Sequence, residues 1–223
     1  MMRWLFVLTT ALGVLVMHAR AEPYWYAYEG NDFPENEGWE RWVSDPAPER
    51  WLEDANLVID SRGIVGSTDD YGIRFESGVD PGPGETFIMR WGLTVEETTH
   101  RDPGVYVHSD EAWSVSFLFD TDSLISVYEP TVYVDIEPYV YHEYEMRSSD
   151  MRNYELYIDG DLAIEGVFFE GFFPLVVGFG DVASNTSLAA WDYFHFGVVP
   201  EPGSIALLTG LCLCMGFRRS GVE

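Results

Sequence analysis

The sequence has no lysine, and its only two cysteines, Cys212 and Cys214, both lie close to the C-terminus. A disulfide or a thiolate-bound metal cannot form in the long region before them, because each needs cysteine sulfur. A cysteine nucleophile is excluded from that region for the same reason. Its stability must therefore come from buried apolar surface and from hydrogen bonds between strands.

Positive charge is scarce along the whole chain. There are 12 arginines against 38 acidic residues, so the formal net charge is −26. Residues 22–199 hold 36 of the acidic residues and 8 arginines, which gives this region −28. Such a field repels nucleic acid and anionic membrane surfaces, so we expect neither as a partner of this region. It attracts cations, including calcium, although solubility in a salty exterior is the simpler interpretation.

Long apolar runs are absent except at the two ends of the chain. Near the N-terminus, residues 4–17 are mostly apolar, follow Arg3 and lead to the small-x-small sequence at 19–21. This order is typical of a secretory signal peptide with its cleavage site. We therefore predict a signal peptide at residues 1–21, with an uncleaved N-terminal membrane anchor as the alternative.

The C-terminal end has three parts: Pro200-Glu201-Pro202, an uncharged run at 203–217, and the pair Arg218 and Arg219. As a helix, at about 1.5 Å per residue, the run would span roughly 22 Å, less than the ~30 Å hydrocarbon core. Its length alone would also suit a buried core helix. The arginine pair at the very end favours a transmembrane helix with its arginines in the cytoplasm and the preceding domain outside.

This three-part order resembles the PEP-CTERM sorting signal, and the resemblance covers residues 199–223. It implies that a tail at 198–223 is held transiently in the inner membrane and processed by an exosortase. It also implies delivery to the cell surface or extracellular matrix of a Gram-negative bacterium that makes exopolysaccharide. It implies nothing about what the domain before the tail does.

The region between the two ends has the pattern of a β protein. Short runs rich in valine, isoleucine and aromatic residues follow one another from about residue 55, and turn sequences at 80–85, 101–104 and 159–161 separate them. Within 113–119, every second residue from Trp113 to Phe119 is apolar, as in a half-buried strand. Only part of 36–54 could be helical. The pattern predicts one antiparallel sandwich or barrel over residues 22–197.

Three segments narrow this prediction: YHEYEM at 141–146, NYELYIDGDLAIEG at 153–166 and WDYFHFG at 191–197. They resemble the late strands of concanavalin A-like, or laminin-G-like, jelly rolls, and the similarity extends over about 30–197. The resemblance implies an all-β, antiparallel jelly-roll β-sandwich. Independently of it, Asp159-Gly160 is a favoured two-residue turn, so we predict a β-hairpin at 153–166.

Laminarinase-type glycosidases of that superfamily place Glu-x-Asp-x-x-Glu on one strand as their catalytic carboxylates. The nearest stretch here has Tyr133 where the first glutamate should be, followed by Asp135 and Glu137. The third carboxylate is displaced as well. We therefore expect no hydrolysis of this type and name no catalytic residue.

The same stretch is our candidate for glycan binding. By the two-residue period of strands, Tyr133, Asp135 and Glu137 share a face, and so do Tyr141 and Glu143 with Glu145 on the next strand. If the two faces coincide, tyrosine rings would lie among carboxylates, which suits sugars because rings stack on pyranose C–H groups and carboxylates accept from hydroxyls. The alternative is a polar outer face whose tyrosines are half-buried.

Other chemistry-bearing residues give weaker signals. Asp159 and Asp161 lie in a turn where their oxygens could bind calcium, but no EF-hand spacing is present. His142 has no second histidine at metal spacing, so we interpret it as a hydrogen-bonded sheet residue. The tryptophans at 39, 42 and 51 are either a sugar platform or, as we expect, part of the core.

The sequence thus favours an exported, non-catalytic, carbohydrate-binding β-sandwich that meets an exosortase and an extracellular polysaccharide. We expect no cofactor, and calcium is the one ion that its turn carboxylates could bind. Two alternatives stay open. One is a glycan hydrolase or lyase with an unrecognised site, and the other is a structural acidic matrix protein that acts through calcium.

Overall fold

The computed structural model describes residues 25–75, 79–109, 113–127, 131–171, 175–183 and 185–200. These residues form an antiparallel jelly-roll β-sandwich of two sheets, which confirms the predicted fold class. In the described chain the helical structure consists of one 3-10 turn, η1 (Pro34–Glu37). The predicted signal peptide at 1–21 lies outside the described residues.

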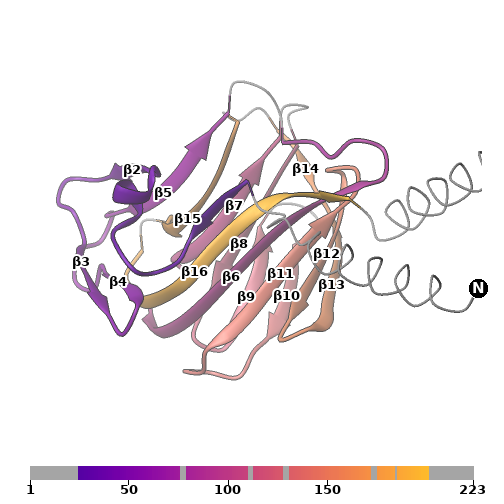
Figure 1. The fold of residues 1–223 in the computed structure, drawn as a ribbon. Helices are drawn as coiled ribbons and strands as arrows, with labels where there is room; N and C mark the ends of the chain where they lie inside the picture. The colour runs from indigo at the N-terminus through magenta and orange to yellow at the C-terminus, as the bar shows by residue number, and fades with distance from the viewer. Residues whose placement is uncertain are drawn as a thin grey trace, which may run out of the picture.

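Sheet A has eight strands, with two 14-residue strands side by side at its centre (Figure 1). Its order is β13 (Asp161–Val167), β12 (Asn153–Ile158), β11 (His142–Ser148), β6 (Glu85–Thr98), β16 (Ser187–Pro200), β4 (Asn56–Asp60) and β3 (Glu49–Glu53), with β1 (Tyr26–Tyr28) also paired to β16.

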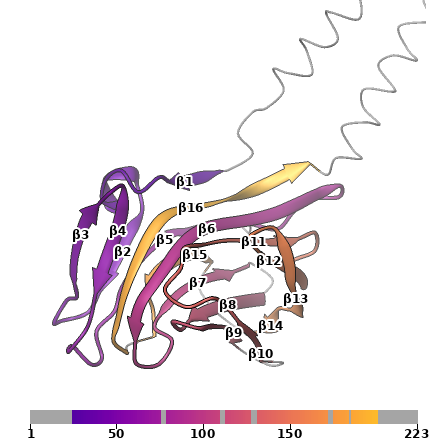
Figure 2. The same ribbon diagram turned by 90° about the horizontal axis from the view of Figure 1, so that it is seen from below.

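Sheet B also has eight strands and packs face to face against sheet A. Figure 2 shows β16 and β6 of sheet A lying above β15, β7 and β8 of sheet B. The order is β10 (Val132–Asp135), β9 (Ser123–Val127), β8 (Trp113–Phe119), β7 (Pro103–His108), β15 (Val176–Asp181), β5 (Asp69–Arg74) and β2 (Glu40–Val43), with β14 (Phe169–Glu170) also paired to β8.

Aromatic side chains from both sheets fill the core. Trp91 of β6 stacks on Tyr144 of β11 with ring centroids 5.3 Å apart, and Phe179 of β15 stacks on Phe194 of β16 at 4.8 Å. The predicted alternation in β8 is confirmed, because its odd-numbered residues from 115 to 119 are buried in this core. Each large aromatic ring buries a large apolar area, and this burial stabilises the fold without a disulfide.

The hairpin at 153–166 is also confirmed. Strands β12 and β13 pair antiparallel around Asp159 and Gly160, whose φ angles are 52° and 88°. Two successive residues with positive φ form the tight turn that matches the twist of a hairpin. Aspartate and glycine both tolerate that conformation, which explains why the sequence alone located the turn.

The segment 36–54, part of which could have been helical by its sequence, is not helical beyond η1. It forms β2 in sheet B and β3 in sheet A, with Pro46 and Pro48 in the connection between the two strands. Its tryptophans consequently have different environments. Trp39 is buried in the core, whereas Trp42 is half-buried and Trp51 is 36% exposed, so the core interpretation was right only for Trp39.

Strand β16 runs three residues past the domain boundary predicted at 197. Pro200, which we assigned to the sorting motif, is the last residue of this strand and lies opposite Glu85 of β6. The rest of the motif, Glu201, Pro202, Arg218 and Arg219, lies outside the described residues, as does the apolar run at 203–217. None of the helical structure among the described residues has the length and apolarity needed to cross a membrane.

Candidate functional site

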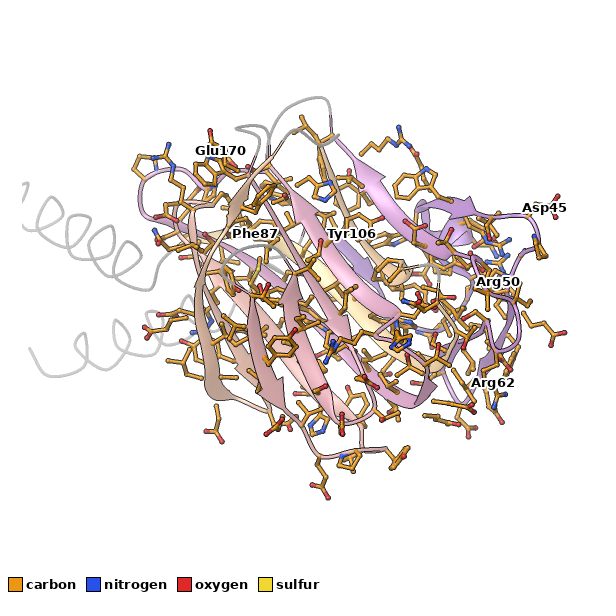
Figure 3. The ribbon with its side chains drawn as sticks, turned by 180° about the vertical axis from the view of Figure 1, so that it is seen from behind. Asp45, Arg50, Arg62, Phe87, Tyr106 and Glu170 are labelled. Carbon is orange, nitrogen blue, oxygen red and sulfur yellow. The ribbon has the colours of Figure 1, made fainter. Side chains whose placement is uncertain are left out.

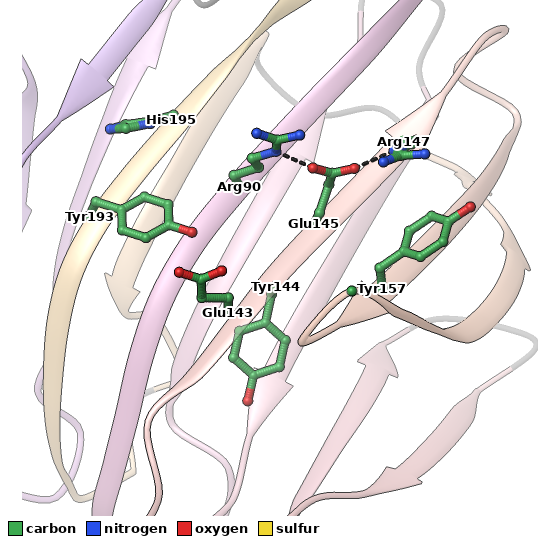
Figure 4. Close-up of a pocket in the computed structure, with 9 residues that line it drawn as sticks. Arg90, Glu143, Tyr144, Glu145, Arg147, Tyr157, Tyr193 and His195 are labelled. Atoms are coloured by element: carbon green, nitrogen blue, oxygen red, sulfur yellow. Dashed lines mark hydrogen bonds and ion pairs between the residues drawn. The ribbon is translucent and has the colours of Figure 1, made fainter.

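The outer face of sheet A carries an open groove of about 660 Å³ (Figure 4). We call it the tyrosine–arginine groove. Its lining residues come from β16, β6, β11, β12 and the turn after β12: Arg90, Glu143, Tyr144, Glu145, Arg147, Tyr157, Gly160, Tyr193 and His195. Tyr144 contributes little, because its ring is buried in the core on the other side of the sheet.

The register of the strands brings these side chains together. His195 lies opposite Arg90, Arg90 opposite Glu145, and Glu145 opposite Tyr157, so four neighbouring strands form one row across the sheet. Adjacent residues along each strand point into the core, as strand alternation requires. Side chains that are far apart in the sequence, from Arg90 to His195, therefore meet on one face of the sheet. No local pattern in the sequence could show this.

Glu145 fixes the charged part of the row. Its two carboxylate oxygens accept hydrogen bonds from the Nε atoms of Arg90 and Arg147. The Arg147 guanidinium also lies 4.6 Å from the ring centroid of Tyr157, whose hydroxyl donates to Glu155 at 2.7 Å. Each group holds its neighbour, so the groove has a defined geometry before any ligand arrives.

A further tyrosine, Tyr141, borders the groove where a glycine leaves room for it. The ring of Tyr141 lies across Gly92, so that a Cβ added at residue 92 would be 2.3 Å from the Tyr141 hydroxyl oxygen. That hydroxyl donates to Asp192 at 3.0 Å, and burial together with this contact raises the pKa of Tyr141. Glu143 lies opposite Gly92 on the neighbouring strand.

The structure therefore divides the predicted glycan-binding set. Tyr141 and Glu143 lie at the groove on sheet A, whereas Tyr133 and Asp135 are on β10, the edge strand of sheet B. Glu137 follows β10, and its backbone carbonyl accepts from His142 Nε2 at 3.0 Å. The two strand faces do not coincide, because the chain crosses from one sheet to the other between them.

Tyr133 has surroundings of its own at the edge of sheet B. It is 60% exposed, and the guanidinium of Arg101 lies 5.0 Å from its ring centroid. That position is open to solvent and lies on the other sheet from the groove.

The turn aspartates serve the fold in the structure described. Asp159 Oδ2 lies 2.7 Å from Nδ1 of the buried His142, and its Oδ1 accepts from the backbone N–H of Glu143 at 2.9 Å. The interpretation of His142 as a hydrogen-bonded sheet residue is confirmed. Asp161 begins β13. Over the described ranges, no three histidine or carboxylate side chains gather as a metal site would require.

The outer face of sheet B carries a second polar cluster, which sequence reasoning missed. Gly72 and Gly178 lie opposite each other in β5 and β15, and rings cover both: Trp42 lies over Gly72 and Tyr106 over Gly178. Figure 3 shows Tyr106 on this side of the molecule. The Tyr106 hydroxyl donates to Asp70 at 2.7 Å. The sequence signal for this cluster is glycine in strands rich in aromatic residues. Only the strand register shows which aromatic ring covers which glycine.

Asp70 is the unusual group of this second cluster. Burial raises its pKa to about 6, and the hydrogen bond from Tyr106 partly opposes that increase. The ring of His108 lies 5.4 Å from that of Tyr106, and Arg74 lies 4.9 Å above the ring of Trp42. A largely buried carboxyl group that titrates near pH 6 and accepts a hydrogen bond from a tyrosine is the kind of group that acid–base sites use.

No family model matches the sequence, and no curated protein matches it. Solved structures share the fold at low identity. A carbohydrate esterase from the Shiga toxin-encoding bacteriophage phi24B is 10% identical with a TM-score of 0.60, and the match covers 80% of this chain and 99% of that one. A Bacillus licheniformis β-glucanase is 10% identical with a TM-score of 0.54, covering 77% and 97%. Peanut lectin is 9% identical with a TM-score of 0.55, covering 78% and 96%.

Proposed function

We propose that this protein is an exported, non-catalytic module that binds a glycan in the tyrosine–arginine groove. The observation that carries the proposal is the row of aromatic and charged side chains held in register across four strands of sheet A. Sugars need both kinds of contact, since rings stack on their C–H faces while charged groups exchange hydrogen bonds with their hydroxyls. The groove offers Tyr157 and Tyr193 as rings and Glu143 as an acceptor.

The charges of the groove favour a neutral glycan. Two arginines and two glutamates line it, so its formal charge is balanced within a chain of net charge −26. An anionic polysaccharide would be repelled by the surrounding field before it reached the groove. A neutral polymer would approach without that barrier, and its affinity would depend little on salt.

The carboxylates of the groove support a non-catalytic role. Glycoside hydrolysis uses a pair of carboxyl groups, one as acid and one as base or nucleophile. Both oxygens of Glu145 already accept hydrogen bonds from arginines, so among the lining residues Glu143 is the one carboxylate that is not held in an ion pair. The similarity in fold to peanut lectin agrees with binding, although the β-glucanase shares the fold as well.

The test is retention of residues 22–200 on immobilised polysaccharides. A bound neutral glycan should be released by Tyr157→Ala and by Tyr193→Ala, each with affinity roughly ten-fold weaker, since 1.4 kcal/mol is ten-fold. Tyr133→Ala, on the edge of sheet B, is the matched control and should change nothing. Retention that depends on Tyr133 and not on the groove tyrosines would refute the groove. Calcium-dependent self-association without retention would favour an acidic matrix protein.

A second candidate function is glycan cleavage at the cluster on sheet B. The observation that favours it is the pKa of about 6 at Asp70, whose carboxylate accepts a hydrogen bond from Tyr106. In that case incubation with the bound polysaccharide should release new chain ends, with a rate that changes near pH 6. Asp70→Asn should abolish the release while leaving retention unchanged. Retention without any release would exclude cleavage of that glycan.

The destination of the protein is a separate part of the proposal. The predicted signal peptide and the PEP-CTERM-like tail support export, a transient stay in the inner membrane, processing by an exosortase, and delivery to the cell surface or matrix. Intact-mass measurement of protein from the surface fraction should show the loss of residues 1–21 and of the chain beyond about Pro202. Recovery of surface protein that still carries Met1 or Arg219 would contradict this part.

A further inference from the structure

Three aspartates are buried at one end of the sandwich. Asp69, Asp102 and Asp181 have exposed fractions of 0%, 0% and 1%. Asp69 has a cation, because Arg41 donates to both of its oxygens at 2.7 Å. In the described part of the chain, none of the ion pairs involves Asp102 or Asp181. These two buried carboxyl groups therefore need another way to limit their charge.

The two groups meet on neighbouring strands of sheet B. Asp181 ends β15 and Asp102 directly precedes β7, with the N–H of Val182 bonded to the Asp102 carbonyl at 3.2 Å. Asp181 lies opposite Pro103, the residue after Asp102, so the two buried carboxyl groups are neighbours across these strands. Among the described residues, Asp181 Oδ2 has no hydrogen-bond partner. Two ionised carboxylates buried so close together without a cation would repel each other, which favours a proton on one of them.

The opposite sheet completes the cluster with hydroxyl groups. Ser61 Oγ lies 3.5 Å from Asp102 Oδ2, and Ser187 Oγ lies 3.4 Å from Asp181 Oδ1. Ser61 follows β4 and Ser187 begins β16, so both belong to the sheet A side of the sandwich. The N–H of Ala183 donates to Asp102 Oδ1 at 2.9 Å. The carboxyl pair thus lies in a polar bridge between the two sheets.

The charged groups described around the pair do not supply a cation that would neutralise a second ionised carboxylate. Asp69 is the cross-strand partner of Asp181, and its charge is already matched by Arg41. Beyond Ser61, Arg62 is held by Asp60 and Glu97. Arg101, which precedes Asp102, lies over the ring of Tyr133. Burial, followed by the contact with Asp102, raises the pKa of Asp181 to about 9.

We propose that Asp102 and Asp181 share one proton, and that this buried carboxyl–carboxylate pair is a pH-sensitive link between the two sheets. The unfolded chain releases the proton near pH 4, the ordinary range of aspartate, whereas the folded chain keeps it. Folding therefore takes up about one proton at neutral pH. By the sign of that linkage, the stabilisation that this pair contributes is complete below about pH 4 and is lost as pH rises to about 9.

The test compares the wild-type chain with Asp181→Asn, in which an amide supplies the donor without titrating. Thermal unfolding is measured between about pH 6 and 9, where exposed carboxylates no longer change charge. The melting temperature of the wild type should fall across this range relative to that of the variant. Proton uptake on folding, measured in buffers of different ionisation enthalpy, should drop by about one in the variant. Asp135→Asn, on the solvent-facing edge of sheet B, is the matched control and should behave as the wild type.

Each result decides the question. Equal pH dependence and equal proton uptake in the wild type and Asp181→Asn would overturn the proposal. A calcium effect would overturn it too. If millimolar calcium at neutral pH raises the melting temperature of the wild type strongly, and Asp181→Asn abolishes that increase, the pair holds a cation. If Asp181→Asn does not fold, infrared spectra of the wild type decide instead. The carbonyl band of a protonated carboxyl group should persist at neutral pH and weaken as the pH rises through about 9, and its absence at neutral pH would overturn the proposal.

Discussion

Phe117 and Trp113 lie four residues apart on the same face of β8, yet they contribute differently to stability. Phe117 is fully buried, with Trp91 at 6.1 Å and Tyr154 at 5.4 Å between ring centroids. Trp113 lies at the end of the strand, half-buried against the core, with Arg152 5.6 Å from its ring. The cost of losing a side chain follows the contacts that it leaves empty.

We expect Phe117→Ala to lower the free energy of unfolding by about 3–5 kcal/mol, the usual result of emptying a buried aromatic site. Trp113→Ala should cost about 1–2 kcal/mol, because part of its ring already contacts water. Urea unfolding of residues 22–200 measures both values. Equal losses would show that the end of β8 is packed as tightly as its middle.

Gly92 offers a second test at the scale of a residue, because its missing side chain makes room for Tyr141. A methyl group there would force the Tyr141 ring away and break its hydrogen bond to Asp192. We expect Gly92→Ala to cost about 1 kcal/mol, similar to losing one hydrogen bond. Glycan retention should weaken as well.

The matched comparison is Tyr141→Phe, which removes the same hydrogen bond and leaves the ring in place. Retention should then stay near the wild-type value if the ring makes the contact. A loss of retention in Tyr141→Phe equal to that in Gly92→Ala would show that the hydroxyl matters and the position of the ring does not.

At the scale of elements, the hairpin of β12 and β13 depends on one side chain in its turn. Asp159 receives hydrogen bonds from the N–H of Glu143 and contacts His142, so it ties the turn to β11. We expect Asp159→Ala to lower the free energy of unfolding by about 1–3 kcal/mol, since two polar groups lose their partner.

Asp159→Asn should recover part of that stability, because asparagine also tolerates the positive φ and keeps an oxygen acceptor for Glu143. Chemical unfolding of the two variants measures the difference, and hydrogen exchange at Glu143 reports the local bond. An alanine variant as stable as the wild type would show that the turn holds itself.

The same scale explains what the sequence could predict. Alternation identified β8, and turn chemistry identified the hairpin, because both are properties of neighbouring residues. The face shared by Glu143 and Glu145 was predictable for that reason. The separation of Tyr133 from Tyr141 was not, since alternation does not say which sheet a strand joins. The groove and the cluster around Asp70 depend on register between distant strands, which leaves no local pattern.

At the scale of the whole molecule, the dominant property is negative charge. Residues 22–199 carry 36 acidic residues and 8 arginines, and their mutual repulsion opposes the compact state. Salt shortens the reach of that repulsion, from about 30 Å at 0.01 M to about 10 Å at 0.1 M. We therefore expect the melting temperature to rise with sodium chloride, steeply at first and then more slowly.

Calcium separates general screening from specific binding. At constant ionic strength, millimolar calcium should add only a small further increase in melting temperature. A specific site would instead add stability that grows with the logarithm of free calcium. A large increase that Asp159→Asn and Asp161→Asn remove would make those residues ligands, contrary to the contacts described above. A melting temperature insensitive to both salts would show that the charges are too dispersed to matter.

Strand β16 has a mechanical consequence. It is paired with β6 up to Pro200, and with β1 at Phe194–Phe196, closer to the same end. In Figure 2 these three strands lie along one edge of the molecule. A tether that continues from Pro200 would pull along the axis of β16. Hydrogen bonds between strands run perpendicular to that axis, so the load would shear many of them at once and could not peel them apart singly. A domain held to a surface by such a tail would resist drag from flowing water through one of its two longest strands.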